Sequence, residues 1–389
     1  MASAGGWLPF DEFMALALYA PGLGYYARGD QQFGHLPRSG PGGSDFVTAP
    51  ELSPMFGAAL AQQVAQALQA LGAGAGGGEG EGEGEGAGAD TVWEFGAGSG
   101  ALAEQLLDAL DSMGVRVTRY CIVDVSGALR ARQAERLARF GARVQWLDHL
   151  PEQMHGVVLG NEVLDAMPVQ LLHFDGRAWH ERGVVAKAKA KAANADTAAS
   201  TATYTATASS FEWADRPTAL RPPVPDALVL PGTVTEIHPQ AQAFIRTLAD
   251  RLQRGAAFFI DYGFPEAEYY HPQRRGGTLM CHRAHRADDD PLQDVGEKDI
   301  TAHIDFSAIA LTAQDAGLEV AGYTTQAHFL MNCGLLDLLQ PASLRERANA
   351  QKLLTEHEMG ELFKVIALTK NLPGFRPLGF VRGDRTHTL

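Results

Sequence analysis

Alternating glycines follow a short apolar run that ends in an acid. Residues 94–100 read EFGAGSG, so Glu94 is followed at every second position by Gly96, Gly98 and Gly100. Glycine permits positive φ and lets a ligand lie against bare backbone, and a helix starting here would offer free N–H groups to an anion. The dinucleotide fingerprint places its last glycine one residue later, which leaves room for a pyrophosphate. The acid before the turn instead favours a ligand with a cationic amino group, such as S-adenosylmethionine (SAM).

A second acid strengthens this prediction, because a glycine turn alone can be purely structural. The run "IVDVS" carries Asp124, about one strand–helix–strand unit after the glycines. A carboxylate at this place can accept hydrogen bonds from both ribose hydroxyls of a nucleoside. Taken alone, Asp124 is also explained as the N-cap of a helix. Together with Glu94 and the glycines it predicts SAM binding, and Asp148 in "WLDHL" is expected near the adenine.

The segment "LGNEVLDAMPVQ" carries the residues that could act on a methyl acceptor: Asn161, Glu162 and Asp165. Carboxylates and an amide carbonyl can orient a nucleophilic nitrogen by accepting its N–H bonds, and they stabilise its positive charge. Methyl transfer is a displacement in which the charge of the donor disperses, so positioning matters more than strong acid or base. The alternative is a capped helix start whose acids are exposed.

Strands that alternate with helices must position these residues. Apolar runs predict strands at 91–95, 119–126, 142–147, 155–163, 256–263 and 362–370, and helical spacing predicts helices at 101–112, 127–140 and 240–253. The segment 169–182 predicts a hairpin around Asp175–Gly176. This order predicts an α/β fold, a Rossmann-like sheet of the class I methyltransferase type with helices on both faces. Ligands bind such sheets at the carboxyl ends of the strands.

Two low-complexity stretches divide the chain. Residues 72–90 are a Gly/Glu-rich linker, and 186–210 are an Ala/Thr/Ser-rich insertion whose three lysines are typical of a solvated loop. Residues 1–71 are expected to form an N-terminal helical cap. Residues 91–389 are expected to form the catalytic domain, with a substrate-side segment at 264–304.

Composition excludes several classes of protein and site. The 389 residues are 46% hydrophobic, enough for one large domain or two ordinary ones, and the formal net charge of -14 argues against nucleic-acid or anionic-membrane partners. The cysteines Cys121, Cys281 and Cys333 form no CxxC pair, so neither a disulfide framework nor a metal site is predicted. No apolar run reaches membrane-spanning length, and the first residues lack the marks of a signal or transit peptide. The chain is therefore predicted to be cytoplasmic.

Six segments, in order, resemble the MidA-like methyltransferases. They are "LYAPGLGYY" (18–26), "SDFVTAPELSPMFG" (44–57), "EFGAGSGALA" (94–103), "GNEVLDAMPV" (160–169), "IDYGFP" (260–265) and "DITAHIDFSAI" (299–309). The resemblance covers nearly the whole chain outside the two low-complexity stretches. This family includes a mitochondrial assembly factor for respiratory complex I that methylates a protein arginine.

The resemblance implies a role for each matching residue. Glu94 and the three glycines match the SAM loop of the family, and Asp124 stands where the family usually has Glu. Asn161, Glu162, Asp165 and Pro168 match a motif for which "NEFFDALP" is more typical. A segment expected to border the cofactor or cap the pocket is matched by Asp45, Thr48, Pro50 and Glu51, with Ser44 in place of a usual Gly.

Three later residues are expected to line the substrate side: Asp261, His303 and Asp305. His303 is the obvious titratable group among them. A structural role is the alternative for this histidine.

The sequence thus predicts a SAM-dependent methyltransferase. The resemblance implies that the acceptor is a protein nitrogen, that of an arginine, and that a respiratory complex I subunit is the partner. An acidic pocket rim suits a guanidinium, which must be oriented and lose a proton. One alternative is a non-catalytic assembly or partner-binding module with a SAM-binding fold, against which Glu94, Gly98 and Asp124 count. The other is a small-molecule or nucleic-acid methyltransferase, but no N-P-P-Y motif is present.

Overall fold

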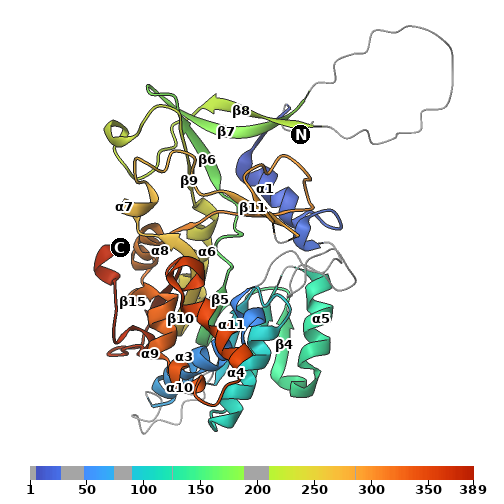
Figure 1. The fold of residues 1–389 in the computed structure, drawn as a ribbon, viewed down its shortest axis with the longest axis vertical. Helices are drawn as coiled ribbons and strands as arrows, with labels where there is room; N and C mark the ends of the chain where they lie inside the picture. Colours follow the sequence, from blue (N-terminus) through green and yellow to red (C-terminus); the bar gives the residue numbers. More distant parts are fainter. Residues whose placement is uncertain (1–5, 28–47, 74–89, 125, 188–209, 285) are drawn as a thin grey trace, which may run out of the picture.

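The described part of the chain is built on three β-sheets (Figure 1). The computed structural model describes residues 6–27, 48–73, 90–124, 126–187, 210–284 and 286–389. Within these residues no helix is both long enough and apolar enough to cross a membrane.

The main sheet carries the glycine turn. Its strand order is β15-β16-β10-β5-β2-β3-β4, and β14 pairs with β10. The strands are β2 (Thr91–Phe95), β3 (Arg119–Val123), β4 (Val144–Leu147), β5 (Met154–Asn161), β10 (Leu252–Phe264), β14 (Ile304–Asp305), β15 (Glu319–Thr325) and β16 (Phe363–Lys370). The pairs among β10, β5, β2, β3 and β4 are parallel, whereas β16 runs antiparallel to both β10 and β15. Parallel strands bring their carboxyl ends to one edge, where the predicted site residues follow them.

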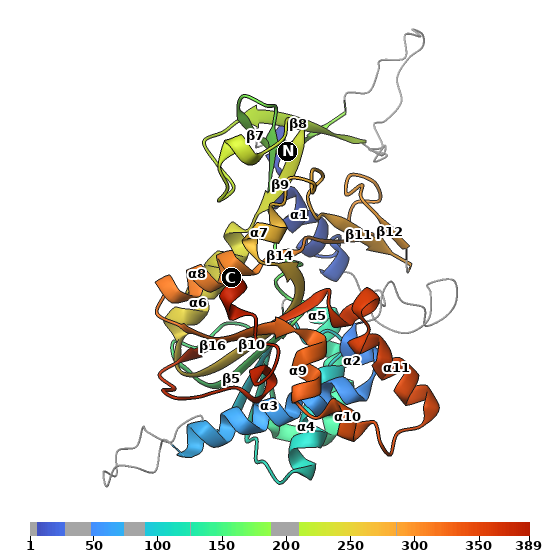
Figure 2. The same cartoon turned by 60° about the vertical axis from the view of Figure 1, so that its left-hand side comes forward.

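Helices cover both faces of this sheet because its central strands are apolar on both sides. Alternate residues separate into two cores: Val92 and Phe258 pack on one face, and Trp93 and Phe259 on the other. On the first face α3 (Pro54–Ala73) and α4 (Ala101–Ser112) lie side by side (Figure 2). The second face packs against α6 (Pro239–Arg251) and α8 (Phe306–Asp315). Each buried phenylalanine contributes about 1.5–3 kcal/mol.

The remaining helices are shorter or flank the sheet. They are α2 (Ala49–Leu52), α5 (Gly127–Leu137), α7 (Glu266–Tyr269), α9 (Gln326–Asn332), α10 (Leu335–Leu338) and α11 (Leu344–Leu354). The helix predicted at 127–140 ends at Leu137, and a 3-10 segment, Ala138–Arg143, continues it.

A second, antiparallel sheet lies above the carboxyl edge of the main sheet in Figure 1. Its order is β1-β7-β6-β9, with β8 paired to β7. The strands are β1 (Trp7–Pro9), β6 (Gln170–Phe174), β7 (Trp179–Ala186), β8 (Phe211–Pro217) and β9 (Thr233–Ile237). The predicted hairpin is present, since β6 and β7 pair across Asp175–Gly176. The helix α1 (Phe10–Tyr19) packs its apolar face on this sheet.

The segment predicted to lie on the substrate side contains the third sheet. Its order is β12-β11-β13, formed by β11 (Met280–Arg283), β12 (Arg286–Asp288) and β13 (Asp299–Thr301). The buried carboxylate of Glu236 in β9 ties this segment down, because it accepts hydrogen bonds from the backbone N–H of Thr278 at 2.8 Å and from the Tyr269 hydroxyl at 2.9 Å.

The N-terminal block does not form the single helical cap that was expected. Residues 7–19 provide β1 and α1 to the second sheet, whereas α3 packs against α4, β5 and β10 of the main fold. The physical reason is the apolar surface of α3, which is buried along its length against the main core. The insertion predicted at 186–210 connects the paired strands β7 and β8, and its residues 188–209 lie outside the described part of the chain, as do residues 74–89 of the linker.

Candidate cofactor and acceptor site

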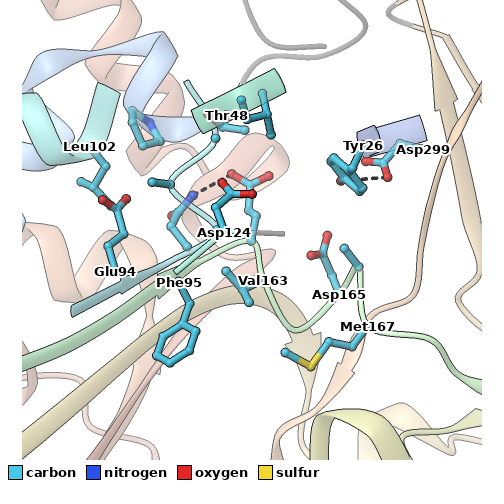
Figure 3. A pocket seen from close by; sticks show the side chains of 18 of the residues that line it. Tyr26, Thr48, Glu94, Phe95, Leu102, Asp124, Val163, Asp165, Met167 and Asp299 are labelled. Atoms are coloured by element: carbon cyan, nitrogen blue, oxygen red, sulfur yellow. Dashed lines mark hydrogen bonds between the residues drawn. The ribbon is translucent and has the colours of Figure 1, made fainter. Parts of the chain in front are cut away.

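A cavity of about 790 Å³ lies at the carboxyl edge of the main sheet. Its wall includes the glycine turn, the residues that follow β3 and β5, and side chains from α1 and β13. Figure 3 shows Glu94, Phe95 and Leu102 at one end of the cavity and Tyr26, Asp299 and Asp165 at the other. The volume falls in the range of small-molecule sites.

Three glycines in the left-handed conformation shape the turn at the first end of the cavity, and two of them, Gly96 and Gly98, line its wall. The φ angles are 61° at Gly96, 53° at Gly98 and 80° at Gly100. A Cβ at Gly96 would approach Val163, a residue of the cavity wall, at 3.0 Å. The turn ends at the start of α4, where Gly100 is the N-cap. At Gly96 and Gly98 the backbone therefore approaches the cavity without a side chain in the way.

Glu94 is a buried carboxylate at the cavity wall, with 2% of its surface exposed. The Tyr120 hydroxyl donates a hydrogen bond to its Oε2 at 2.7 Å. Burial raises the pKa of Glu94 to about 8, and Asp124 adds to this effect while the Tyr120 hydrogen bond opposes it. An acid in this state gains its negative charge readily when a cation approaches.

Asp124 is held against the glycine turn by Gln133, a buried residue of α5 that sequence reasoning did not select. The Gln133 Nε2 donates to the Gly98 carbonyl at 2.9 Å and to Asp124 Oδ2 at 2.8 Å. The Oε1 of the same amide accepts from the Trp146 indole at 2.9 Å. Both carboxylate oxygens are fixed, because Asp124 Oδ1 accepts from the backbone N–H of Ser126 at 2.9 Å.

The turn after β5 brings the three predicted catalytic residues to the cavity: Asn161, Glu162 and Asp165. Glu162 has a φ of 54°, a left-handed conformation that is uncommon for a residue with a side chain. Its Oε1 accepts a hydrogen bond from Asn161 Nδ2 at 3.0 Å. Burial raises the pKa of Glu162 to about 8, with Asp165 adding to it, and burial raises the pKa of Asp165 to about 6.

Asp261 shapes this turn from behind and does not line the cavity. Its Oδ2 accepts from three successive backbone N–H groups, those of Val163 at 3.1 Å, Leu164 at 2.9 Å and Asp165 at 3.4 Å. Burial holds the pKa of Asp261 well above its ordinary range, and Asp165 and Glu162 add to this. The substrate-lining role expected for Asp261 is replaced by a structural one, because its carboxylate is occupied by the backbone.

Replacing Asp261 with Ala is expected to lower the free energy of unfolding by about 2–3 kcal/mol, because three buried N–H groups lose their acceptor. That loss outweighs the relieved repulsion with Asp165. Urea denaturation measures the difference, and Asp315→Ala, an exposed site at the end of α8, serves as control. Equal stability of the Asp261→Ala variant and the control would contradict the role of Asp261.

The other predicted residues divide between the cavity and its surroundings. Thr48 and His303 line the cavity, and burial lowers the pKa of His303 to about 4. Glu51 lies outside the wall and hydrogen-bonds to Ser99 of the glycine turn. Asp305 caps α8 by accepting from the Ala308 N–H at 3.1 Å. Asp45 is outside the described residues.

Asp148 does not reach the cavity wall described here, so its predicted place near an adenine has no support in the geometry. Its side chain is 75% exposed and forms an ion pair with Arg130 at 2.7 Å. The carboxylate of Asp148 is thus paired with a side chain of α5 and is exposed to solvent.

Several polar residues of the cavity wall were not predicted from the sequence. They are Tyr19, Tyr26, Tyr262, His282 and Asp299. All of them except His282 lie in segments that carried the family resemblance, 18–26, 260–265 and 299–309, so the resemblance was the available indication. Their chemistry arises from contacts across the chain, such as the hydrogen bond from the Tyr26 hydroxyl to Asp299 Oδ1 at 2.9 Å.

The family model described as "Putative S-adenosyl-L-methionine-dependent methyltransferase" matches residues 59–324. The chain belongs to this family. The predicted family and the predicted class I methyltransferase fold are therefore confirmed, and this methyltransferase takes SAM as its cofactor.

Known relatives resemble the methyltransferase along most of their length. A crystal structure from Burkholderia thailandensis bound to S-adenosyl-homocysteine (SAH) is 48% identical, with a TM-score of 0.86 over 100% of this chain and 94% of that one. The mitochondrial protein arginine methyltransferase NDUFAF7 homologue of Caenorhabditis elegans is 25% identical over 396 residues, 93% of this chain and 83% of its own length. The Xenopus tropicalis NDUFAF7 protein is 25% identical over 402 residues, 93% of this chain and 82% of its own.

The cavity residues fit this cofactor. The glycine turn leaves room for a ligand against the backbone, and two acids, Glu94 and Asp124, stand at the ends of adjacent strands. Asn161 and Asp165 each have a buried oxygen, Oδ1 in both cases, without a hydrogen-bond partner among the described residues. Such oxygens favour a bound donor.

Proposed function

We propose that this methyltransferase transfers a methyl group to a guanidino nitrogen of arginine in a protein. The observation that carries the proposal is the charge of the cavity wall. Among the described residues that line it there are no Lys or Arg, whereas it has five carboxylates: Glu94, Asp124, Glu162, Asp165 and Asp299. Burial lowers the pKa of both wall histidines, His282 and His303, so they stay neutral at pH 7. A wall that carries five acids and no basic side chain favours a cationic acceptor, and the approach of a cation favours the ionised forms of Glu94 and Glu162, whose pKa burial raises to about 8.

The cofactor end is proposed to use its two acids separately. Glu94 accepts hydrogen bonds from an ammonium group, and Asp124 accepts those of ribose hydroxyls. When bound, SAM supplies an electrophilic methyl group. Gln133 and Tyr120 hold these acids in place through the hydrogen bonds described above.

The residues after β5 are proposed to act on the acceptor. Asn161 and Asp165 use their unpartnered oxygens to orient the attacking nitrogen. As that nitrogen gains its methyl group, it loses an N–H proton, which Asp165 accepts. Glu162 lies beside them and stabilises the positive charge that the guanidinium retains. The pKa of Asp165, about 6, leaves it ionised at pH 7 and able to take the proton.

The arginine assignment is also supported by the Caenorhabditis elegans and Xenopus tropicalis relatives, which are named protein arginine methyltransferases. By the MidA-like resemblance, we propose a respiratory complex I subunit as the acceptor protein.

The test uses the full chain with labelled SAM and pairs of basic peptides that differ only in Arg or Lys at the centre. Peptides from respiratory complex I subunits are the first set, followed by a random basic set. We expect the Arg member of a pair to accept label at least about 100-fold faster. Methylation of Lys alone would overturn the proposal. Calorimetric binding of SAH without labelling of any peptide would instead support the non-catalytic module.

A further inference from the structure

The end of the cavity that lies opposite Glu94, which we call the acceptor end, is built from three separate parts of the fold. Tyr19 comes from α1, Tyr26 from the 3-10 turn Tyr25–Ala27, and Asp299 from β13. All three line the cavity, and Figure 3 shows Tyr26 and Asp299 joined at the end opposite Glu94, with Asp165 nearby. These side chains face the space where the proposed acceptor enters.

The two tyrosines form a fixed aromatic wall. Their rings are stacked, with centroids 5.7 Å apart and an angle of 17° between the planes. The Tyr19 hydroxyl donates to the Ala166 carbonyl at 2.7 Å, and the Tyr26 hydroxyl donates to Asp299 Oδ1 at 2.9 Å. The hydrogen bonds hold the position of each hydroxyl, and the stacking of the two rings constrains their planes.

Two carboxylates share this space. Burial is the main reason that the pKa of both phenols lies above the ordinary value, and Asp299 and Asp165 each add to it. Asp165 is 3% exposed, and its Oδ1 has no hydrogen-bond partner among the residues that the structure describes. A buried carboxylate oxygen left in this state is costly, which indicates that a ligand donates to it.

Resting on the proposed function, we infer that Tyr19, Tyr26 and Asp299 form the subsite that selects a guanidinium over an ammonium. A guanidinium is planar, stacks on aromatic rings and directs several N–H donors in one plane. It can therefore lie along the tyrosine wall and donate to Asp299 and Asp165 together. An ammonium is a compact, strongly hydrated charge, which uses the acids but gains little from a flat wall.

The subsite is linked to the cofactor end by backbone contacts. The Ser126 hydroxyl donates to the Tyr26 carbonyl at 2.6 Å, and the backbone N–H of Ser126 donates to Asp124 Oδ1 at 2.9 Å. Ser126 also caps α5 by accepting from the Leu129 N–H at 3.3 Å. The acid proposed for the ribose and the tyrosine wall are thus joined through one serine.

The first test removes the negative charge of Asp299. Asp299→Asn keeps the volume and an acceptor for Tyr26, and it is expected to lower kcat/KM for the best Arg peptide by about 10–100-fold, mainly through KM. The Kd of SAH is expected to stay within about twofold, because the cofactor end is unchanged. Asp315→Asn, at an exposed site, makes the same chemical change as a control.

The second test separates the ring face from the hydroxyl. Tyr19→Phe keeps the face, whereas Tyr19→Leu removes it, so we expect Leu to lower kcat/KM for the Arg peptide about fivefold relative to Phe. The matching control is Tyr323→Phe, because Tyr323 lies outside the described cavity wall and its hydroxyl has no partner among the described residues.

The outcomes distinguish the subsite from the proposed function. If the wild-type protein methylates Arg peptides but Asp299→Asn and Tyr19→Leu match their controls, the subsite is wrong and the proposed function stands. If the wild-type protein methylates Lys peptides instead, both are overturned. A loss of Arg methylation in Asp299→Asn with SAH binding retained supports the subsite.

Discussion

Asp165→Asn is expected to lower kcat for arginine methylation by about 10²–10³-fold while SAH binds as tightly as in the wild-type protein. Asn keeps the shape of the side chain and can accept one hydrogen bond. It cannot take up the proton that the attacking nitrogen loses, nor can it carry the negative charge. Single-turnover labelling of the best Arg peptide measures the chemical step directly.

The pH dependence gives this prediction a second readout. Burial raises the pKa of Asp165 to about 6, so its ionised form is lost as the pH falls below that value. Since the ionised form is the proton acceptor, wild-type kcat/KM for the peptide, measured at saturating SAM, should fall as pH decreases through about 6. Asp165→Asn should lose this acid limb. A variant with the turnover and pH profile of the Asp315→Asn control would rule out Asp165 as the proton acceptor.

The cofactor end was largely predictable because its information is local. Glu94 lies near the end of the apolar strand β2, the three glycines follow that strand and Asp124 follows β3, and parallel strands bring their ends to one edge. The spacing of these residues therefore carries both the turn geometry and the position of the acids. The order of strands and helices predicted the main sheet for the same reason.

The acceptor end was less predictable because it depends on contacts between distant parts of the chain. Asp261 has the form of a site residue, an acid after an apolar strand, yet the backbone of the turn after β5 occupies its carboxylate. Asp148 has the same form, but Arg130 draws it outward. Asp299 accepts a hydrogen bond from the hydroxyl of Tyr26, which is 273 residues away in the sequence. The type of a residue and its neighbours do not determine such pairings.

The split of the N-terminal block has a similar cause. Helical periodicity reports that α1 and α3 each have an apolar face, but not which core covers it. The structure assigns α1 to the second sheet and α3 to the main sheet. This division places Tyr19, at the end of α1, over the acceptor end of the cavity, and so the same segment that was expected to be a cap provides part of the proposed subsite.

Glu94→Gln is expected to weaken SAH binding at pH 7.5 by about 10–100-fold, because a neutral amide replaces the carboxylate proposed to bind the ammonium group. Burial raises the pKa of Glu94 to about 8, so in the free wild-type protein this group is mostly protonated at neutral pH. Binding an ammonium favours the ionised form, and the affinity of the wild-type protein should rise with pH by up to about tenfold per unit between 6 and 7.5. Measurements stay in this range because α-amino groups lose their own proton near pH 8.

The increase of SAH affinity with pH should vanish in Glu94→Gln and persist in Glu135→Gln, an exposed site on α5. Methylthioadenosine, which lacks the amino-acid part of SAH, separates the ammonium from the nucleoside. It should bind wild-type protein and Glu94→Gln equally, and without a pH slope, because the acid proposed for its ribose is Asp124. Calorimetry with both ligands therefore assigns the two acids independently. Equal loss of SAH and methylthioadenosine affinity in Glu94→Gln would mean that Glu94 supports the glycine turn, and the ammonium would need another partner.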